Sequence, residues 1–290
     1  MKRAKYKIEW QAEAEFRVGE EIEISQLPDR SRIVFHKSND KKTGKIFVEV
    51  DRPDASIARD KGRQLIEQFF NCVLIASEGE IMIRSIALGN LELLNPEDFK
   101  GELKTSIRDI TQRVAITAKL EQQTLGTAAG LLTRIDRLPQ EQQDIIFRSL
   151  RWFGRAPEAN EEDRFILRWI SFEALFGLSR KPEMKGKGLI QDFINDFYDK
   201  DTAERILQKH KKTVEDLSNA NLVGLGGGTP SEDLRKELEK NKDYRAILQK
   251  VALCIYEVRN HLFHKGRAHG LMQRSSSLLR DIIREYFNYL

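Results

Sequence analysis

The segment Tyr6-Lys7-Ile8-Glu9-Trp10 alternates apolar and polar side chains, which is the period-two pattern of a half-buried β-strand. The alternation returns in Phe16-Arg17-Val18 and in Glu21-Ile22-Glu23-Ile24. Successive side chains of a strand point to opposite faces, so each segment offers one apolar face for burial. Residues 5–50 are therefore expected to form strands.

A hairpin and a helix are expected next. Arg32-Ile33-Val34-Phe35 and Ile46-Phe47-Val48-Glu49-Val50 flank a polar turn that ends in Gly44, which predicts a hairpin with a long loop. Residues 56–76 carry apolar side chains every three or four places, as an amphipathic helix does.

Two further strands are predicted in Glu80-Ile81-Met82-Ile83-Arg84-Ser85-Ile86 and in Leu91-Glu92-Leu93-Leu94. Asn95-Pro96-Glu97-Asp98 has the cap, the proline and the acids that begin a helix. Residues 124–130 are small and polar enough for a connector, so we place a domain boundary near 125–138. The first domain, 1–130, is expected to be a mixed α/β domain.

Almost all of the remaining chain has helical periodicity. One helix is expected to begin near Pro139, and a second, rich in aromatic residues, to end at Gly177 by C-terminal capping. Amphipathic segments follow at 188–199, 201–219, 231–263 and 271–289. Residues 139–290 are expected to form an all-α helical bundle, which makes the fold class α+β.

Composition bounds the class of protein. The chain has 290 residues, of which 40% are hydrophobic and 32% charged, as in a soluble globular protein. Charges interrupt every apolar run, so no membrane span is expected. The basic start lacks an apolar segment after it, and two isolated cysteines (Cys72 and Cys254) fit reduced core thiols, so a cytoplasmic location is expected. The net charge of +4 is compatible with a nucleic-acid partner.

Charged and imidazole side chains concentrate near the C-terminus, where three of the five histidines lie within nine residues. They belong to a predicted helix that buries one apolar face and ends near Gly266. On that helix Glu257, His261 and His264 lie at i, i+4 and i+7 and share one side, and Asn260 precedes His264 by four residues.

These residue types suit the cleavage of RNA. Histidine moves protons near neutral pH, and arginine binds phosphate through two parallel hydrogen bonds. Together they can activate a ribose 2′-hydroxyl and neutralise the charge that builds on the phosphate, without a metal. One helix cannot easily place an acid and a base on opposite sides of the phosphorus atom, whereas two copies related by a two-fold axis can.

The segment Arg259-Asn260-His261-Leu262-Phe263-His264 resembles the R-x4-6-H motif of the HEPN-domain ribonucleases. Ile255-Tyr256-Glu257-Val258 before it, Lys265-Gly266 after it, and the stretch Phe165-Ile166-Leu167-Arg168-Trp169-Ile170-Ser171-Phe172-Glu173-Ala174-Leu175-Phe176-Gly177 resemble the Apea-like branch of that family. The resemblance covers residues 139–290 and leaves the first domain unexplained.

The resemblance implies a metal-independent endoribonuclease without a cofactor that acts as a homodimer. It assigns Arg259 to the phosphate, His264 to proton transfer and Asn260 to the orientation of one of them. Glu173 and His261 would have supporting roles.

Lys265 and Arg267, cations beside the motif, are candidates for substrate binding. Related members carry a modifiable tyrosine two places after the histidine; here that place is Gly266, so control by that modification is not expected. The implied role is RNA cleavage, with tRNA among the candidate substrates, in prokaryotic phage defence or stress-induced growth arrest. The first domain would sense a trigger, bind a regulatory partner or select the substrate.

Other interpretations of the same residues stay open. Arg259 and His264 could be cations at an exposed helix end. Glu257, His261 and His264, joined by His269, could ligate zinc. The glycines at 224–228 invite a phosphate-loop interpretation but lack its lysine and preceding strand, which favours a linker. The helical domain could also bind RNA or nucleotides without cutting, or serve only for dimerisation.

Overall fold

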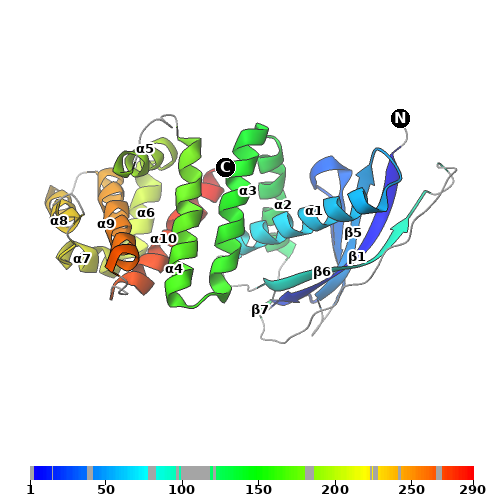
Figure 1. Cartoon of the computed structure of the whole chain (residues 1–290), viewed down its shortest axis with the longest axis horizontal. Coiled ribbons are helices and arrows are strands. Elements are labelled where there is room, and N and C mark those ends of the chain that lie inside the picture. Colours follow the sequence, from blue (N-terminus) through cyan, green and yellow to red (C-terminus); the bar gives the residue numbers. More distant parts are fainter. Residues whose placement is uncertain are drawn as a thin grey trace. The chain divides into compact units, whose positions relative to one another are not determined.

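The computed structural model divides the chain into two compact units, Met1–Leu138 and Pro139–Leu290 (Figure 1). The first contains an antiparallel sheet with helices, and the second is all-helical over its described residues, so the α+β class is confirmed. The structure describes residues 3–14, 16–37, 42–77, 83–95, 98, 118–119, 122–179, 186–222, 224, 228–240, 243–265 and 270–290.

The first unit is built on a five-stranded sheet in the order β3-β4-β5-β1-β6, in which every neighbouring pair is antiparallel. A separate parallel pair joins β2 to β7. The strands are β1 (Ala4–Ala14), β2 (Phe16–Arg17), β3 (Ile22–Ile24), β4 (Arg32–Phe35), β5 (Lys42–Val50), β6 (Ile83–Leu93) and β7 (Ala118–Lys119), with a 3-10 turn, η1, at Pro28–Arg30.

Helix α1 (Ala55–Ala76) packs on one face of this sheet (Figure 1). The Asp54 side chain caps its start by accepting hydrogen bonds from the backbone amides of Ser56 and Ile57. Alternate residues of β1 are buried, and the Trp10 ring meets those of Phe35 and Phe70 edge-on at 5.1 and 5.4 Å. The alternation in the sequence thus marks the face that α1 covers.

The predicted hairpin is confirmed, since β4 pairs with β5. Gly44 is needed in it because a Cβ there would lie 1.9 Å from the Val34 carbonyl oxygen and 2.6 Å from Trp10 Nε1. Of the two strands predicted between 80 and 94, Glu80, Ile81 and Met82 lie outside the described residues. Residues 83–93 form one strand, β6, which pairs with β1 through two register shifts.

The expected connector at 124–130 is wrong, because these residues lie in helix α2 (Gln122–Asp136). Leu125, Ala128 and Leu132 recur at helical spacing and are buried, and α2 packs on α1. Of the predicted helix start at 95–98, Pro96 and Glu97 lie outside the described residues. Asn95 anchors the end of β6, since its side chain accepts a hydrogen bond from the Lys5 amide, and its carbonyl oxygen accepts one from the Asp98 amide at 3.2 Å.

The second unit contains helices α3 (Gln140–Arg155), α4 (Glu161–Ala174), α5 (Lys187–Phe197), α6 (Lys200–Lys209), α7 (Lys211–Asn219), α8 (Pro230–Lys240), α9 (Tyr244–Lys265) and α10 (Met272–Tyr289), with 3-10 turns η3 (Ala156–Glu158) and η4 (Leu175–Leu178). The segments predicted at 201–219 and 231–263 are therefore two helices each. Gly177 does not end α4 as a cap; it lies in η4, where a Cβ would come 3.0 Å from Ile145 Cδ1.

Aromatic side chains fill the core between α4, α5 and α10. Trp169, Phe172, Phe193 and Tyr286 are buried, and the buried Tyr198 hydroxyl donates to the Ile282 carbonyl at 2.7 Å. Both cysteines are free and buried, as expected. None of the described helices is long and apolar enough to cross a membrane.

Candidate functional site

Helix α9 carries the motif and buries the apolar face that the sequence predicted. Ile247, Val251, Ile255 and Val258 on that face are buried, whereas Leu262 is only partly so. The burial extends to polar residues of the motif region, because Glu257 is 1% exposed and Asn260 4% exposed. Buried polar groups of this kind need partners.

Glu257 finds its partners on two sides. Lys187, at the start of α5, places its Nζ 2.8 Å from Glu257 Oε1, and Asn260 Nδ2 donates to Glu257 Oε2 at 3.1 Å. Because the Lys187 side chain is 45% exposed, the cation stays partly hydrated while the carboxylate is dry. Glu257 therefore fixes the position of Asn260 and ties α9 to α5.

Asn260 in turn holds Arg259. The Arg259 Nη1 donates to Asn260 Oδ1 at 3.1 Å, and the guanidinium lies over the Phe263 ring, 4.3 Å from its centre. The Nε–H of Arg259 is buried and has no acceptor among the described residues. The guanidinium is thus oriented by two neighbours on its own helix.

Arg259 lines a pocket of about 300 Å³ between α4, α5 and α9. The Trp169 Nε1–H donates to Glu173 Oε2 at 3.2 Å, and the Trp169 ring lies 5.6 Å from that of Tyr256. The other lining residues are Phe176, Gly177, Gly186, Leu189 and Ile190. The structure therefore brings together a guanidinium, a carboxylate and aromatic rings from segments more than eighty residues apart.

The expected site residues are placed unequally. Arg259 and Glu173 line the same pocket, and the buried Asn260 side chain orients Arg259 by a hydrogen bond. His261 is partly buried on the same helix. His264 and Lys265 belong to the α9 backbone, but their side chains lie outside the described part of the structure, as does the whole of Arg267.

The zinc interpretation loses support from the contacts of Glu257. Both of its oxygens face donors, Lys187 on one side and Asn260 on the other, so the carboxylate is committed to them. Among the described residues, no group of three or more His, Cys, Asp or Glu side chains could hold a metal ion.

Sequence reasoning missed Lys187 and Gly224. Gly224 was expected in a linker, yet a Cβ on it would lie 2.9 Å from Glu257 Oε1 and 3.1 Å from Lys187 Nζ. Its backbone amide also donates to the Gly228 carbonyl at 2.8 Å. The absence of a side chain thus lets the backbone at Gly224 come close to the Glu257–Lys187 ion pair, which no local sequence pattern predicts.

The chain matches no protein-family model, no curated protein and no solved structure in these three comparisons. The geometry by itself defines a pocket in an all-helical unit, with one oriented arginine and one carboxylate in its wall.

Proposed function

We propose that the helical unit is a metal-independent endoribonuclease of the HEPN type. The observation that carries the proposal is the placement of Arg259, which lines a pocket with Glu173 and is oriented by the buried Asn260. An arginine held in this way can bind a phosphate without first losing the freedom of its own side chain.

Arg259 would stabilise the charge that develops on the phosphate oxygens as the phosphorus becomes five-coordinate. The neighbouring ring of Tyr256 and the carboxylate of Glu173 would hold the nucleotide beside the scissile bond. A cavity of about 300 Å³ is at the lower end of the range for small-molecule sites, which suits one nucleobase better than a folded RNA element.

His264 would transfer the protons. A base removes the 2′-hydroxyl proton, the 2′-oxygen bonds to phosphorus, and the bond to the 5′-oxygen breaks as an acid protonates it. The products are a 2′,3′-cyclic phosphate and a 5′-hydroxyl. Since one copy of α9 supplies one such histidine, the second would come from the partner in a homodimer.

The biological role in this proposal follows the resemblance of the motif to HEPN ribonucleases. Cleavage of cellular RNA, with tRNA as one candidate, would halt growth during phage infection or stress. The first unit would supply the trigger response or the choice of substrate.

The test uses the full chain, a labelled single-stranded RNA and excess EDTA. We expect cleavage that survives chelation and falls 100-fold or more, on the order of the loss of one transition-state donor, in Arg259→Ala and in His264→Ala. Arg245→Ala, which removes an exposed arginine from the same helix, and His36→Ala in the first unit are the matched controls and should cleave normally. An all-deoxy oligonucleotide should resist cleavage.

Loss of cleavage with EDTA, or full activity in both site variants, would refute the proposal. Binding of RNA without cleavage, abolished by Arg259→Ala, would instead establish the alternative of a non-catalytic RNA-binding or nucleotide-binding module.

A further inference from the structure

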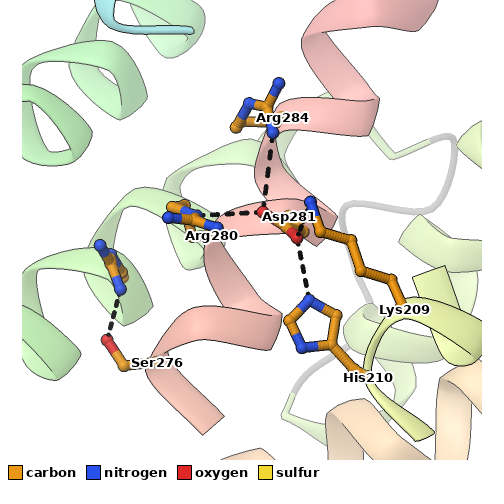
Figure 2. Close-up of polar contacts among 7 residues, drawn as sticks. Lys209, His210, Ser276, Arg280, Asp281 and Arg284 are labelled. Atoms are coloured by element: carbon orange, nitrogen blue, oxygen red, sulfur yellow. Dashed lines mark hydrogen bonds and ion pairs between the residues drawn. The ribbon is translucent and has the colours of Figure 1, made fainter. Parts of the chain in front are cut away.

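A second group of charged residues lies on α4, α6, α10 and the turn after α6. Figure 2 shows Lys209, His210, Arg280 and Arg284 directed at one carboxylate, that of Asp281. The distances to its oxygens are 2.8 Å from Lys209 Nζ, 2.9 Å from His210 Nε2 and 3.0 Å from Arg280 Nε. We call these four residues, together with Arg168, the cationic cluster.

Asp281 is the anion at the centre of the cationic cluster and is 3% exposed. Burial alone would raise the pKa of its carboxyl, but hydrogen bonds from His210, Lys209 and Arg280 outweigh burial and hold the pKa well below its usual value. Asp281 is therefore a permanent negative charge that fixes the directions of the surrounding cations.

The cationic cluster holds more positive charge than Asp281 can balance. Lys209, Arg280 and Arg284 face this carboxylate, and Arg168 donates instead to the Ser276 hydroxyl at 2.9 Å. Even with Arg284 left out, three positive charges in this set (Lys209, Arg280 and Arg168) stand against one negative charge before His210 is counted. Burial and the nearby Arg280 and Arg164 charges lower the pKa of Arg168 to about 10, as expected where cations crowd together.

Two cations of the cluster are accessible from solvent, whereas the Arg284 side chain is only 11% exposed. The Lys209 side chain is 51% exposed and that of Arg280 is 26% exposed, so an anion can reach both from solvent. Arginine forks match phosphate oxygens, and a lysine adds a mobile charge. We propose that the cationic cluster binds the phosphate groups of a nucleic-acid strand.

The position of the cationic cluster on α4 relates it to the Arg259 pocket. Arg168 and Glu173 are five residues apart on this helix, which corresponds to about 7.5 Å along its axis. Arg168 contacts Ser276 of α10, whereas Glu173 lines the pocket with α9. Five positions also turn the two side chains about 140° apart around the axis of α4, so a strand that contacts both crosses the surface of this helix, with a nucleotide in the pocket and phosphates further along at the cluster. That the strand is RNA rests on the proposed function.

The experiment measures binding apart from cleavage, using the full chain and a labelled 2′-O-methyl RNA that cannot be cut. We expect Lys209→Gln and Arg280→Gln each to weaken binding roughly 3-fold to 10-fold at moderate salt. Each should also reduce the slope of log affinity against log salt concentration by about 0.7, the value for one lost single-strand phosphate contact. Lys236→Gln, which removes an exposed charge from α8, should change neither quantity.

Unchanged affinity and slope in Lys209→Gln would overturn the proposal. If Arg280→Gln does not fold, the test rests on Lys209→Gln, because the Lys209 side chain is half exposed and its replacement should leave the fold intact. A changed oligomeric state with unaltered RNA affinity would also overturn it, since the cluster would then face an acidic surface of another copy. The proposal would also be overturned if inorganic phosphate displaces the RNA more strongly than chloride at equal ionic strength and does so equally in wild type and in both variants, because the phosphate site would then lie elsewhere. If the chain binds RNA through the cluster but does not cleave it, this inference is supported and the proposed nuclease function is refuted.

Discussion

Arg259 donates a hydrogen bond from Nη1 to the side-chain oxygen of Asn260, the residue next to it in sequence, at 3.1 Å. Neighbours on a helix point about 100° apart, so the contact depends on Arg259 bending toward a partner that is itself fixed. Asn260 is fixed because it is buried and donates to Glu257. Glu257 thus positions Asn260, and Asn260 in turn positions Arg259.

Asn260→Ala should lower RNA cleavage about 10-fold by releasing Arg259, while leaving the arginine in place. If Asn260 acts only through Arg259, adding Asn260→Ala to Arg259→Ala should cause no further loss. Single-turnover cleavage rates for the four members of this double-mutant cycle provide the measurement. Multiplicative losses in the double variant would show that Asn260 has a role independent of Arg259.

Gly224→Ala should destabilise the second unit by about 1 kcal/mol, because the new Cβ displaces the ends of Glu257 and Lys187 from their pairing. Gly228→Ala is the matched control from the same loop, since a Cβ there has no atom within 4 Å. Its effect should stay within about 0.5 kcal/mol. Urea denaturation of both variants gives the comparison, and equal stability would show that the ion pair shifts without cost.

Asp281→Asn should destabilise the second unit by about 2–4 kcal/mol at pH 7, because it leaves the surrounding cations without their anion. The pH dependence follows from the lowered pKa of the carboxyl. The unfolded aspartate has a pKa of about 3.9, so the folded carboxylate stabilises fully above that pH and loses its contribution as the pH falls toward the folded value.

The stability difference between wild type and Asp281→Asn should therefore shrink as the pH is lowered below about 4. Chemical denaturation of both proteins at pH 7, 5 and 3.5 measures it. A difference that stays constant over this range would mean that the Asp281 carboxyl titrates alike in the folded and unfolded chains.

Gly44→Ala should destabilise the first unit by roughly 2–4 kcal/mol, since its Cβ would overlap the Val34 carbonyl oxygen, a backbone atom that cannot move aside. Gly126→Ala in α2 should instead stabilise that unit by about 0.5–1 kcal/mol, because a Cβ there meets nothing and alanine favours the helix. Thermal unfolding followed by circular dichroism would separate the two effects; a stabilised Gly44→Ala would contradict the hairpin packing.

Periodicity predicted elements whose apolar face is buried. The alternation in β1 matches the face covered by α1, and the three-to-four spacing in α9 matches its buried side. Predictions failed where a residue serves a distant neighbour. Residues 124–130 look like a connector because they are small, yet they lie in α2, which packs on α1 and buries Leu125, Ala128 and Ala129 of this segment.

The site divides in the same way. The motif segment pointed to Arg259 and Asn260, because their types and spacing are local properties, and the earlier helix pointed to Glu173. No local sequence pattern marks Lys187, because its function is to pair with Glu257, which lies on another helix seventy positions away in the sequence.

By itself the sequence determined the α+β class, the change from sheet to helices and the helix that carries the arginine, because hydrophobic periodicity encodes each element's buried face. Only the tertiary structure decided that Arg259 and Glu173 share a pocket and that Glu257 is buried against Lys187. It also decided that Lys209 from α6, His210 from the following turn, and Arg280 and Arg284 from α10 surround Asp281. The physical reason is that burial and charge pairing depend on distances through space, and these are set by how helices pack rather than by spacing along the chain.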